Sequence, residues 1–292
     1  MGDSNKGDIR NWWADAPMTY AATHGSTTYR RPGGSYEEVA IGSRRFYELA
    51  DEVFLSWNTP LHGPEGAFSN IFPFEAMRGK KVLEAGCGMG FMAMQWAMRG
   101  ANMHAVDLNP VAVVNTKHRF ETFNLPGTIQ EADAENLPFA SGEFDYAYSW
   151  GVLHHTPGTK RAIEELRRVL KPGAQVGVML YNRHSFLAQY VNRFTEGFVN
   201  LESRFLTPLE LQCRYGDGHR EEGNYHTWPV TVHEVHTDLF RQFSKVCVKL
   251  LGTDIDSILW HWFPDFLSKF PLAWRKALAR RWGWSLWITA VK

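Results

Sequence analysis

The chain has 292 residues and no net charge at neutral pH, because 31 basic residues balance 31 acidic ones. This balance provides no overall field to attract nucleic acid, so a neutral small molecule is the better candidate partner. Three cysteines without CxxC spacing indicate neither a zinc site nor a disulfide framework, and without a long apolar run or a secretory signal we expect a cytoplasmic protein.

The N-terminal region, residues 1–75, is predicted to form a helical lid. Its stretch WWADAPMTY is too rich in aromatic and polar groups for a disordered tail. A helix is expected from Ser35, with Glu38 as its capping partner.

From Lys80 onward, short apolar runs alternate with segments of helical spacing. Strands are expected at 80–86, 102–108, 127–133, 144–150 and 175–181, with helices in most of the connections. Such alternation is typical of right-handed βαβ units and a parallel sheet, in which ligands bind beyond the carboxyl ends of the strands.

The C-terminal part departs from this alternation. TVHEVHTDLFRQF opens with a capping box from Thr231 to Glu234, and SKVCVKLLG and GWSLWITAVK have the pattern of two closing antiparallel strands. We therefore expect an α/β fold with a doubly wound, mostly parallel sheet of seven strands. Its predicted regions are the lid (1–75), a ligand-binding core (76–182), an insert covering the acceptor (183–229) and the C-terminal part of the sheet (230–292).

The strongest chemical signal is VLEAGCGMG, which spans residues 82–90 between a strand and a helix. Gly86, Gly88 and Gly90 let the backbone turn sharply and approach a ligand closely, where the following helix offers N–H groups at its N-terminus. A glycine-rich turn alone is equally compatible with a tight connection that binds nothing.

Two acidic residues follow the next strands. Asp107 ends the second strand, where a carboxylate can accept protons from both hydroxyls of a ribose. Asp133 could accept a proton from an adenine amino group, with Leu108 and Ala134 packed on the ring. A lone aspartate in a loop is more often a turn former, but three successive strand ends with matched chemistry favour a nucleoside-like ligand.

These motifs resemble those of the class I S-adenosylmethionine-dependent methyltransferases, in the small-molecule group with a type 11 domain that includes quinone C-methyltransferases. The resemblance is carried by VLEAGCGMG, AVDLNP, EADAENLPFASGEFDYAYSWGVLHH and RAIEELRRVLKPG, over roughly residues 78–182. It implies a Rossmann-like fold and S-adenosyl-L-methionine as the cofactor.

The resemblance also implies roles for individual residues. Glu84 and the loop of Gly86, Cys87, Gly88 and Gly90 would hold the methionine part of the cofactor. Asp107 would bind the ribose, and Asp133 with Ala134 would bind the adenine. Leu108, which could pack on the ring, and Trp150 at the end of the fourth strand are further cofactor-binding candidates.

The stretch SWGVLHHTP places His154 and His155 directly after the fourth strand. Side chains of neighbours in an extended or turning chain diverge, so joint metal binding is disfavoured and no metal is predicted. Either histidine could act as a general base or pack under the loop, and the resemblance favours His154. Relatives often have an acidic residue after the fifth strand to orient a histidine, whereas this chain has Leu180 and Tyr181.

Further candidates come from the lid and the insert. Tyr20 and His24 could touch the cofactor or acceptor, and Tyr20 and His184 are also catalytic candidates. The aromatic residues Tyr181, Tyr225 and Trp228 could line an acceptor pocket or could anchor loops to the sheet.

The segment SILWHWFPDFLSKFPLAWRKALARRWGW mixes aromatic and basic residues. Such a segment can lie on a membrane surface, but a solvated charged face over a packed aromatic one is the commoner explanation. His233 and His236 could share a helix face, yet no further metal ligand accompanies them.

The function expected from these patterns is methyl transfer to a small, partly apolar or aromatic acceptor by in-line displacement. Because the leaving group is good, the enzyme would chiefly align the reactants and exclude water, with a base only for an acceptor that must lose a proton. Two alternatives stay open: methylation of a macromolecule, and a non-catalytic adenosyl-binding protein of the same fold. The oligomeric state is also open, with a dimer among the options.

Overall fold

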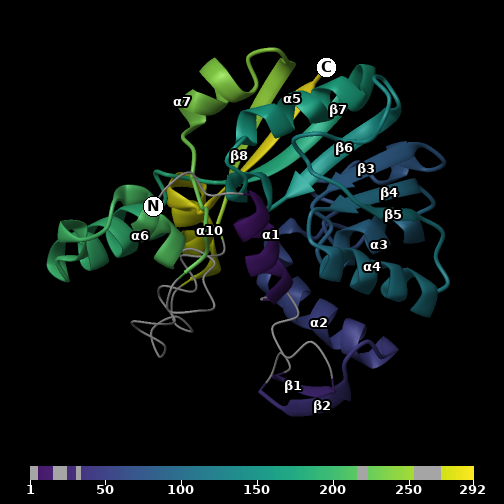
Figure 1. The fold of residues 1–292 in the computed structure, drawn as a ribbon, viewed down its shortest axis with the longest axis horizontal. Helices are drawn as coiled ribbons and strands as arrows, with labels where there is room; N and C mark the ends of the chain where they lie inside the picture. Colours follow the sequence, from purple (N-terminus) through teal and green to yellow (C-terminus); the bar gives the residue numbers. More distant parts are fainter. Residues whose placement is uncertain (1–5, 16–24, 31–33, 216–222, 253–270) are drawn as a thin grey trace. The chain divides into compact units, whose positions relative to one another are not determined.

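A computed structural model describes residues 6–15, 25–30, 34–215, 223–252 and 271–292 (Figure 1). The chain divides into two compact units. The N-terminal unit comprises Arg10–Tyr148 and Arg168–Ala174, and the C-terminal unit comprises Met1–Ile9, Ser149–Arg167 and Gln175–Lys292. The boundaries fall inside four elements, which therefore contribute to both units: α1 (Lys6–Asp15), β6 (Phe144–Trp150), α5 (Thr159–Val169) and β7 (Leu170–Tyr181).

Seven strands form one sheet in the order β5-β4-β3-β6-β7-β9-β8. β3 (Lys81–Ala85) pairs in parallel with β4 (Asn102–Asp107) and with β6, and β4 pairs in parallel with β5 (Thr128–Glu131). β9 (Ser285–Val291) is antiparallel to both β7 and β8 (Ser244–Leu251). The predicted α/β fold, with a mostly parallel seven-stranded sheet and an antiparallel ending, is confirmed.

The helices of the N-terminal unit follow its strands. α3 (Phe91–Met98) begins directly after the glycine-rich turn and contacts β4, while α4 (Pro110–Thr122) contacts both β4 and β5. Asn109 caps α4, since its side-chain oxygen accepts from the Val111 N–H at 2.9 Å. Pro110 occupies the first turn, where its missing N–H costs nothing.

An aromatic cluster fixes α3 against the sheet. Trp96 is fully buried, and its ring centroid lies 4.5 Å from Phe74, 5.4 Å from Phe72, 5.2 Å from Tyr146 and 5.5 Å from Tyr148. Tilted and edge-on rings at these distances add to the apolar area that they bury. The strand ends and the turn after β3 therefore rest on a closely packed support.

The expectation of a helix from Ser35 is wrong. This stretch forms β2 (Tyr36–Ala40), which pairs antiparallel with β1 (Ser26–Arg30), and α2 (Arg44–Trp57) begins only after Ser43. The Ser43 hydroxyl, not that of Ser35, caps the helix by accepting from the Phe46 N–H at 3.1 Å. Strand pairing satisfies the backbone of residues 36–40 and so overrides the local capping pattern. Two short 3-10 helices follow, η1 (Thr59–Leu61) and η2 (Glu75–Met77).

The C-terminal unit carries short helices around its strands. They are η3 (Leu153–His155), the π-helix η4 (Leu187–Val199), η5 (Glu202–Arg204), α6 (Pro208–Tyr215), α7 (Val232–Glu234), η6 (Val235–Leu239) and α10 (Leu272–Trp282). Within the predicted insert, η4 contacts both η5 and α6. The capping box from Thr231 to Glu234 is confirmed. No helix in the described part of the chain is long and apolar enough to cross a membrane.

A buried ion pair joins α4 to α2. Arg119 is 1% exposed, its Nη2 donates to Asp51 Oδ1 at 2.7 Å, and its guanidinium lies 4.7 Å from the ring centre of Tyr47. The other two nitrogens, Nε and Nη1, have no hydrogen-bond partner among the described residues. Burial raises the pKa of Asp51 to about 6, although the Arg119 charge acts in the opposite direction. The buried charge of Arg119 or of Asp51 would therefore lower the stability of the fold if its partner were removed.

Arg119→Met should lower the free energy of unfolding by about 3–5 kcal/mol, because Asp51 would stay buried without its cation. Burial raises the pKa of Asp51 from 3.8 to about 6 in the folded protein, even though the Arg119 charge lowers it. Removal of that charge should raise the pKa further. Ionisation of Asp51 therefore opposes folding more strongly in the variant as the pH rises. Urea denaturation should therefore show a larger loss at about pH 8 than at about pH 5. Arg78→Met is the control, because Arg78 forms only an exposed pair with Glu75; equal losses in the two variants would contradict the prediction.

Candidate cofactor and acceptor sites

The turn after β3 is held by main-chain hydrogen bonds to β4. The N–H groups of Gly86 and Cys87 both donate to the carbonyl of Val106, at 2.8 and 3.0 Å, and the Gly90 N–H closes the turn onto the Cys87 carbonyl at 2.8 Å. Gly86, Gly88 and Gly90 have φ values of 86°, 52° and 74°, and residues other than glycine rarely adopt such positive values. The spacing of the glycines therefore follows from the geometry of this turn.

Two of these glycines have different surroundings. A Cβ on Gly90 would lie 2.7 Å from Cγ2 of Thr116, whereas a Cβ on Gly88 would have no described atom within 4 Å. Thr116 also donates from its hydroxyl to the Gly88 carbonyl at 2.8 Å, which ties the turn to α4. Gly90 is thus required by packing inside the protein, while Gly88 leaves room for another molecule.

The carboxylate of Asp107 lies at the end of β4 and reaches both neighbouring loops. Oδ2 accepts from the Gly88 N–H at 2.8 Å and Oδ1 accepts from the Asn109 N–H at 2.9 Å. Burial raises the pKa of Asp107, and the backbone N–H donors partly oppose that effect. Each oxygen has a further lone pair, so the group can still accept from two adjacent hydroxyls of a ligand.

Glu84 is a buried acid with an unsatisfied oxygen. It is 2% exposed, and its Oε2 has no hydrogen-bond partner within the described parts of the chain. Burial raises the pKa of Glu84 well above its ordinary value; the Tyr148 hydroxyl and the Ala93 N–H act in the opposite direction, and the nearby charge of Asp107 raises the pKa further. A ligand carrying a positive N–H donor would relieve both the missing hydrogen bond and the unfavourable charge.

The remaining predicted cofactor residues differ in their contacts. Asp133 accepts from the Glu135 N–H at 2.9 Å, which is the turn-forming role of a loop aspartate, and Ala134 next to it is half-buried. Cys87 is buried, its Sγ lies 3.7 Å from Oγ1 of Thr116, and burial raises the pKa of its thiol well above the ordinary value. The Cys87 side chain therefore packs inside the turn, and its predicted role in cofactor binding stays a prediction.

The sequence did not predict the contacts between α1 and the loop that follows β4. Arg10 of α1 donates from Nε to the Leu108 carbonyl at 3.2 Å and from Nη2 to Oε1 of Glu131 at 2.7 Å. The Asn109 side chain donates to the carbonyl of Trp13 at 2.7 Å. Part of the predicted lid is thus fastened to the loop that follows Asp107. The motif AVDLNP contains both loop residues, but no local pattern indicates which distant segment they bind.

In the C-terminal unit, His154 is enclosed by aromatic rings. It is fully buried, and its ring centroid lies 3.7 Å from Tyr181 and 4.2 Å from His155. Neither ring nitrogen has a hydrogen-bond partner among the described residues. Burial lowers the pKa of His154 well below its ordinary value, and the charges of His155 and His226 act in the same direction. His154 is therefore held as a neutral ring.

His155 is tied to the insert. Its Nδ1 lies 2.9 Å from the carbonyl oxygen of His226 and 3.1 Å from the hydroxyl of Thr227. The next residue, Trp228, donates its N–H to the carbonyl of His154 at 2.9 Å. The structure therefore brings both histidines against the end of the insert, a contact that no sequence pattern indicated.

The other predicted acceptor residues fall into buried and exposed groups. Tyr181 is buried between the rings of His154 and Trp284, and the ring centroids of Trp150 and Trp287 are 5.6 Å apart. In contrast, Tyr225 and Trp228 are 46% and 38% exposed, and His184 is exposed. The predicted residues Tyr20 and His24 lie outside the described residues, as does most of the aromatic and basic segment before α10.

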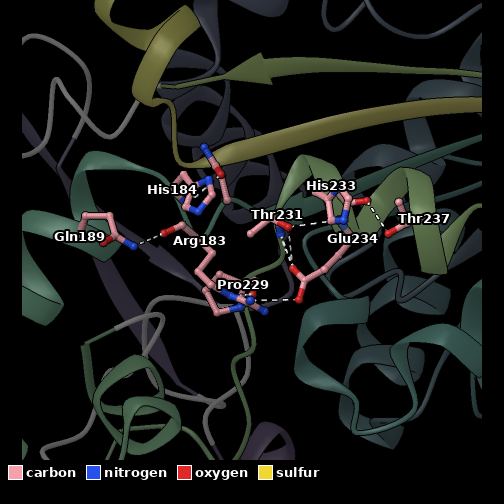
Figure 2. A network of polar contacts seen from close by, with 9 residues as sticks. Arg183, His184, Gln189, Pro229, Thr231, His233, Glu234 and Thr237 are labelled. Carbon is pink, nitrogen blue, oxygen red and sulfur yellow. Dashed lines mark hydrogen bonds and ion pairs between the residues drawn. The ribbon is translucent and has the colours of Figure 1, made fainter.

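A polar network joins the two ends of the insert (Figure 2). Arg183 donates to the Pro229 carbonyl at 3.0 Å and to Glu234 Oε1 at 2.9 Å, while Gln189 donates to the Arg183 carbonyl at 2.7 Å. Burial alone would raise the pKa of Glu234, but hydrogen bonds from the Thr231 N–H and hydroxyl and from Arg183 lower it. The insert therefore begins and ends at one anchored point.

Comparison with known proteins identifies the domain. Residues 82–173 match the family model described as a methyltransferase domain. The chain is 34% identical over 148 residues to a ubiquinone biosynthesis O-methyltransferase of Dechloromonas aromatica, covering 47% of this chain and 62% of that protein. It is 31% identical over 151 residues to the protein of the same name from Pseudomonas aeruginosa, covering 46% and 62%. The chain therefore spans less than two thirds of the length of these curated relatives.

Solved structures share the fold. A methyltransferase of Methanosarcina mazei that depends on S-adenosylmethionine has a TM-score of 0.52 at 20% identity, covering 76% of this chain and 98% of that one. Phosphoethanolamine N-methyltransferase 2 of Haemonchus contortus, in complex with S-adenosylmethionine, has a TM-score of 0.53 at 19% identity, covering 88% and 62%. The fold is thus that of the class I methyltransferases. Taken with the matched domain, this means that the chain contains a class I S-adenosylmethionine-dependent methyltransferase domain.

The residues of the N-terminal unit fit the cofactor of this family. The unsatisfied Oε2 of Glu84 suits an ammonium group, and the two oxygens of Asp107 suit a ribose diol. The open space at Gly88 lets a ligand approach the backbone closely. The sequence prediction of S-adenosylmethionine therefore agrees with the chemistry of the hydrogen-bond acceptors that the fold brings together.

Gly88→Ala and Gly90→Ala form a matched pair that separates ligand contact from packing. Both add a Cβ at positive φ, at a cost of about 1–2 kcal/mol. Only Gly90→Ala also meets Thr116, so it should lower the free energy of unfolding further. Gly88→Ala should instead weaken binding of S-adenosylhomocysteine by at least about tenfold, or about 1.4 kcal/mol.

Calorimetric titration and urea denaturation of the two glycine variants test this difference. If Gly88→Ala keeps the wild-type affinity for S-adenosylhomocysteine, then the open space at this glycine does not contact the cofactor.

Proposed function

We propose that this protein transfers a methyl group from S-adenosylmethionine to a small, partly apolar or aromatic acceptor. The observation that carries the proposal is the pair of acids at adjacent strand ends. Glu84 has one unsatisfied oxygen, and Asp107 is held by the Gly88 and Asn109 N–H groups with lone pairs to spare. A buried acid without its hydrogen bond lowers stability, and a ligand that completes the hydrogen bond would remove that cost.

When bound, the cofactor supplies a methyl group on a positively charged sulphur that is already a good leaving group. The chain would then contribute binding and alignment. Glu84 would accept from the amino group, Asp107 would accept from the ribose hydroxyls, and the turn at Gly88 would follow the ligand closely. Such alignment is worth several kcal/mol of barrier without any further chemical group.

An aromatic hydroxyl is the acceptor class that the observations favour. The curated relatives are named ubiquinone biosynthesis O-methyltransferases. In the C-terminal unit, His154, Tyr181 and Trp284 stack in a buried row, which supports an apolar or aromatic acceptor. The balance of 31 basic and 31 acidic residues argues against a nucleic-acid acceptor.

Asp107→Ala should weaken binding of S-adenosylhomocysteine by about 10- to 100-fold, because it removes charge-assisted hydrogen bonds worth about 1.5–3 kcal/mol. Asp145→Ala is the matched control, since Asp145 lies near the beginning of β6 and accepts from Lys171 and from the Lys81 N–H. Calorimetric titration should show a loss only for Asp107→Ala. Absence of cofactor binding in the wild-type protein would contradict the proposed function.

Methyl transfer itself can be followed with labelled S-adenosylmethionine. The acceptors would be a catechol-type phenol, total RNA and a mixture of proteins, with products identified by mass spectrometry. We expect label in the phenol. Label only in RNA or protein would establish a macromolecular acceptor instead, and cofactor binding without transfer to any acceptor would indicate a non-catalytic adenosyl-binding protein.

A further inference from the structure

Two buried polar side chains lie on adjacent strands of the N-terminal unit. Glu84 of β3 and Tyr148 of β6 are direct partners in the parallel pairing of these strands. Side chains at paired positions point to the same face of a sheet, and neighbouring strands lie about 4.8 Å apart. Glu84 is 2% exposed and Tyr148 is fully buried. The carboxyl group and the phenol hydroxyl therefore lie on one face of the sheet, away from water.

Both side chains carry an unsatisfied oxygen. Neither the Tyr148 hydroxyl nor Oε2 of Glu84 has a hydrogen-bond partner in the described parts of the chain. Burial raises the pKa of Glu84, and the Tyr148 hydroxyl lies near enough to act against that effect. Burial also raises the pKa of Tyr148 well above its ordinary value, and the charge of Glu84 raises it further. Tyr148 therefore keeps its proton and can donate it in a hydrogen bond to the carboxylate.

Aromatic rings hold the side chain of Tyr148 in place. Its ring centroid lies 5.0 Å from that of Phe72, 5.5 Å from that of Trp96 and 6.2 Å from that of Tyr146. Trp96 and Tyr146 are themselves buried. A closely packed core leaves a side chain little room to change its rotamer. The packing therefore restricts the Tyr148 hydroxyl to the neighbourhood of Glu84.

The other ionisable groups around Glu84 give it no hydrogen bond. The charge of Asp107 raises the pKa of Glu84. The Cys87 thiol, whose own pKa is raised by burial and by the charges of Asp107 and Glu84, lies against Thr116. On the side of α3, the Ala93 N–H acts on the carboxyl of Glu84 as a backbone donor. Among the described side chains that act on this carboxyl, Tyr148 is therefore the one donor.

A cation beside Glu84 would strengthen the hydrogen bond from Tyr148. Such a cation favours the ionised form of the carboxyl. A carboxylate has about four lone-pair sites, so it can accept from an ammonium group and from a phenol hydroxyl at the same time. A hydrogen bond to an ionised acceptor is roughly twice as strong as one between neutral groups. The Tyr148 hydroxyl would therefore favour the binding of a cation that it does not itself touch.

We propose that Tyr148 is a positioning residue that donates its hydroxyl hydrogen to the Glu84 carboxylate and so strengthens the contact of Glu84 with the ammonium group of S-adenosylmethionine. The inference rests on the cofactor binding in the proposed function and is independent of the acceptor. The phenol keeps its proton, so no bond is formed or broken. Tyr148 thus favours ligands that carry the amino-acid part of the cofactor over ligands that carry the adenosine part alone.

Calorimetric titration of Tyr148→Phe in the full-length protein tests this role, because the substitution removes only the hydroxyl. The variant should bind S-adenosylhomocysteine at least about fivefold more weakly than the wild type, the difference between a charged and a neutral hydrogen bond. It should bind 5′-methylthioadenosine, which has no amino-acid part, as tightly as the wild type. An unchanged affinity for S-adenosylhomocysteine, or an equal loss for both ligands, would overturn the proposal.

Tyr146→Phe is the matched control. Tyr146 also has a buried hydroxyl without a hydrogen-bond partner among the described residues, but it pairs across the strands with Val82 rather than with an acid. This variant should keep the wild-type affinity for both ligands. A loss of S-adenosylhomocysteine affinity as large as that of Tyr148→Phe would show that any buried hydroxyl in this core has the same effect, and would overturn the role of Tyr148.

A double-mutant cycle with Glu84→Gln tests whether Tyr148 acts through the carboxylate. In the Glu84→Gln background, Tyr148→Phe should change the affinity for S-adenosylhomocysteine by less than about twofold. A loss as large as in the wild-type background would overturn the role. If the wild type binds neither ligand, the proposed function fails together with this inference. If the wild type binds S-adenosylhomocysteine and Tyr148→Phe binds it equally well, only the positioning role of Tyr148 fails.

Discussion

Two hydrogen bonds to the carboxylate of Asp107 hold the loops that follow β3 and β4 in the N-terminal unit. With two oxygens the carboxylate holds the N–H of Gly88, in the turn between β3 and α3, and the N–H of Asn109, which begins α4. Both loops therefore take their shape from one side chain at the end of β4. The hydrogen bond from Asn109 to the Trp13 carbonyl extends this dependence to α1. A change at Asp107 would thus alter both loops and the proposed ligand contacts together.

Thirteen buried side-chain polar atoms lack a hydrogen-bond partner among the described residues, and three of them belong to residues predicted for the cofactor and acceptor sites. Oε2 of Glu84 and both ring nitrogens of His154 lack a partner in the described parts of the chain. Each such atom costs of order 1–3 kcal/mol. Burial shifts both groups toward their neutral forms, which raises the pKa of Glu84 and lowers that of His154. Glu84 suits a cationic ligand group, and His154 suits a neutral ring packed among aromatic side chains.

The C-terminal unit organises its polar groups through the insert. The pairing of Arg183 with Glu234 and with the Pro229 carbonyl anchors both ends of the insert (Figure 2). The segment 223–228 is held against Cys213 and delivers Thr227 to His155. The ends and the Thr227 segment are therefore fixed by different contacts, so the loop can keep a precise hydrogen bond near its C-terminal end.

The sequence by itself determined the alternation of strands and helices, the glycine-rich turn and the capping box at Thr231, because these depend on residues close together in the chain. The position of Asp107 at the end of a strand was also predicted, since it follows from that alternation. Only the tertiary structure decided that Ser35 precedes a strand, that Arg10 binds the Leu108 loop, and that Thr227 contacts His155. The partners in these contacts come from distant or separately folded segments, and their hydrogen bonds form only when the chain has folded.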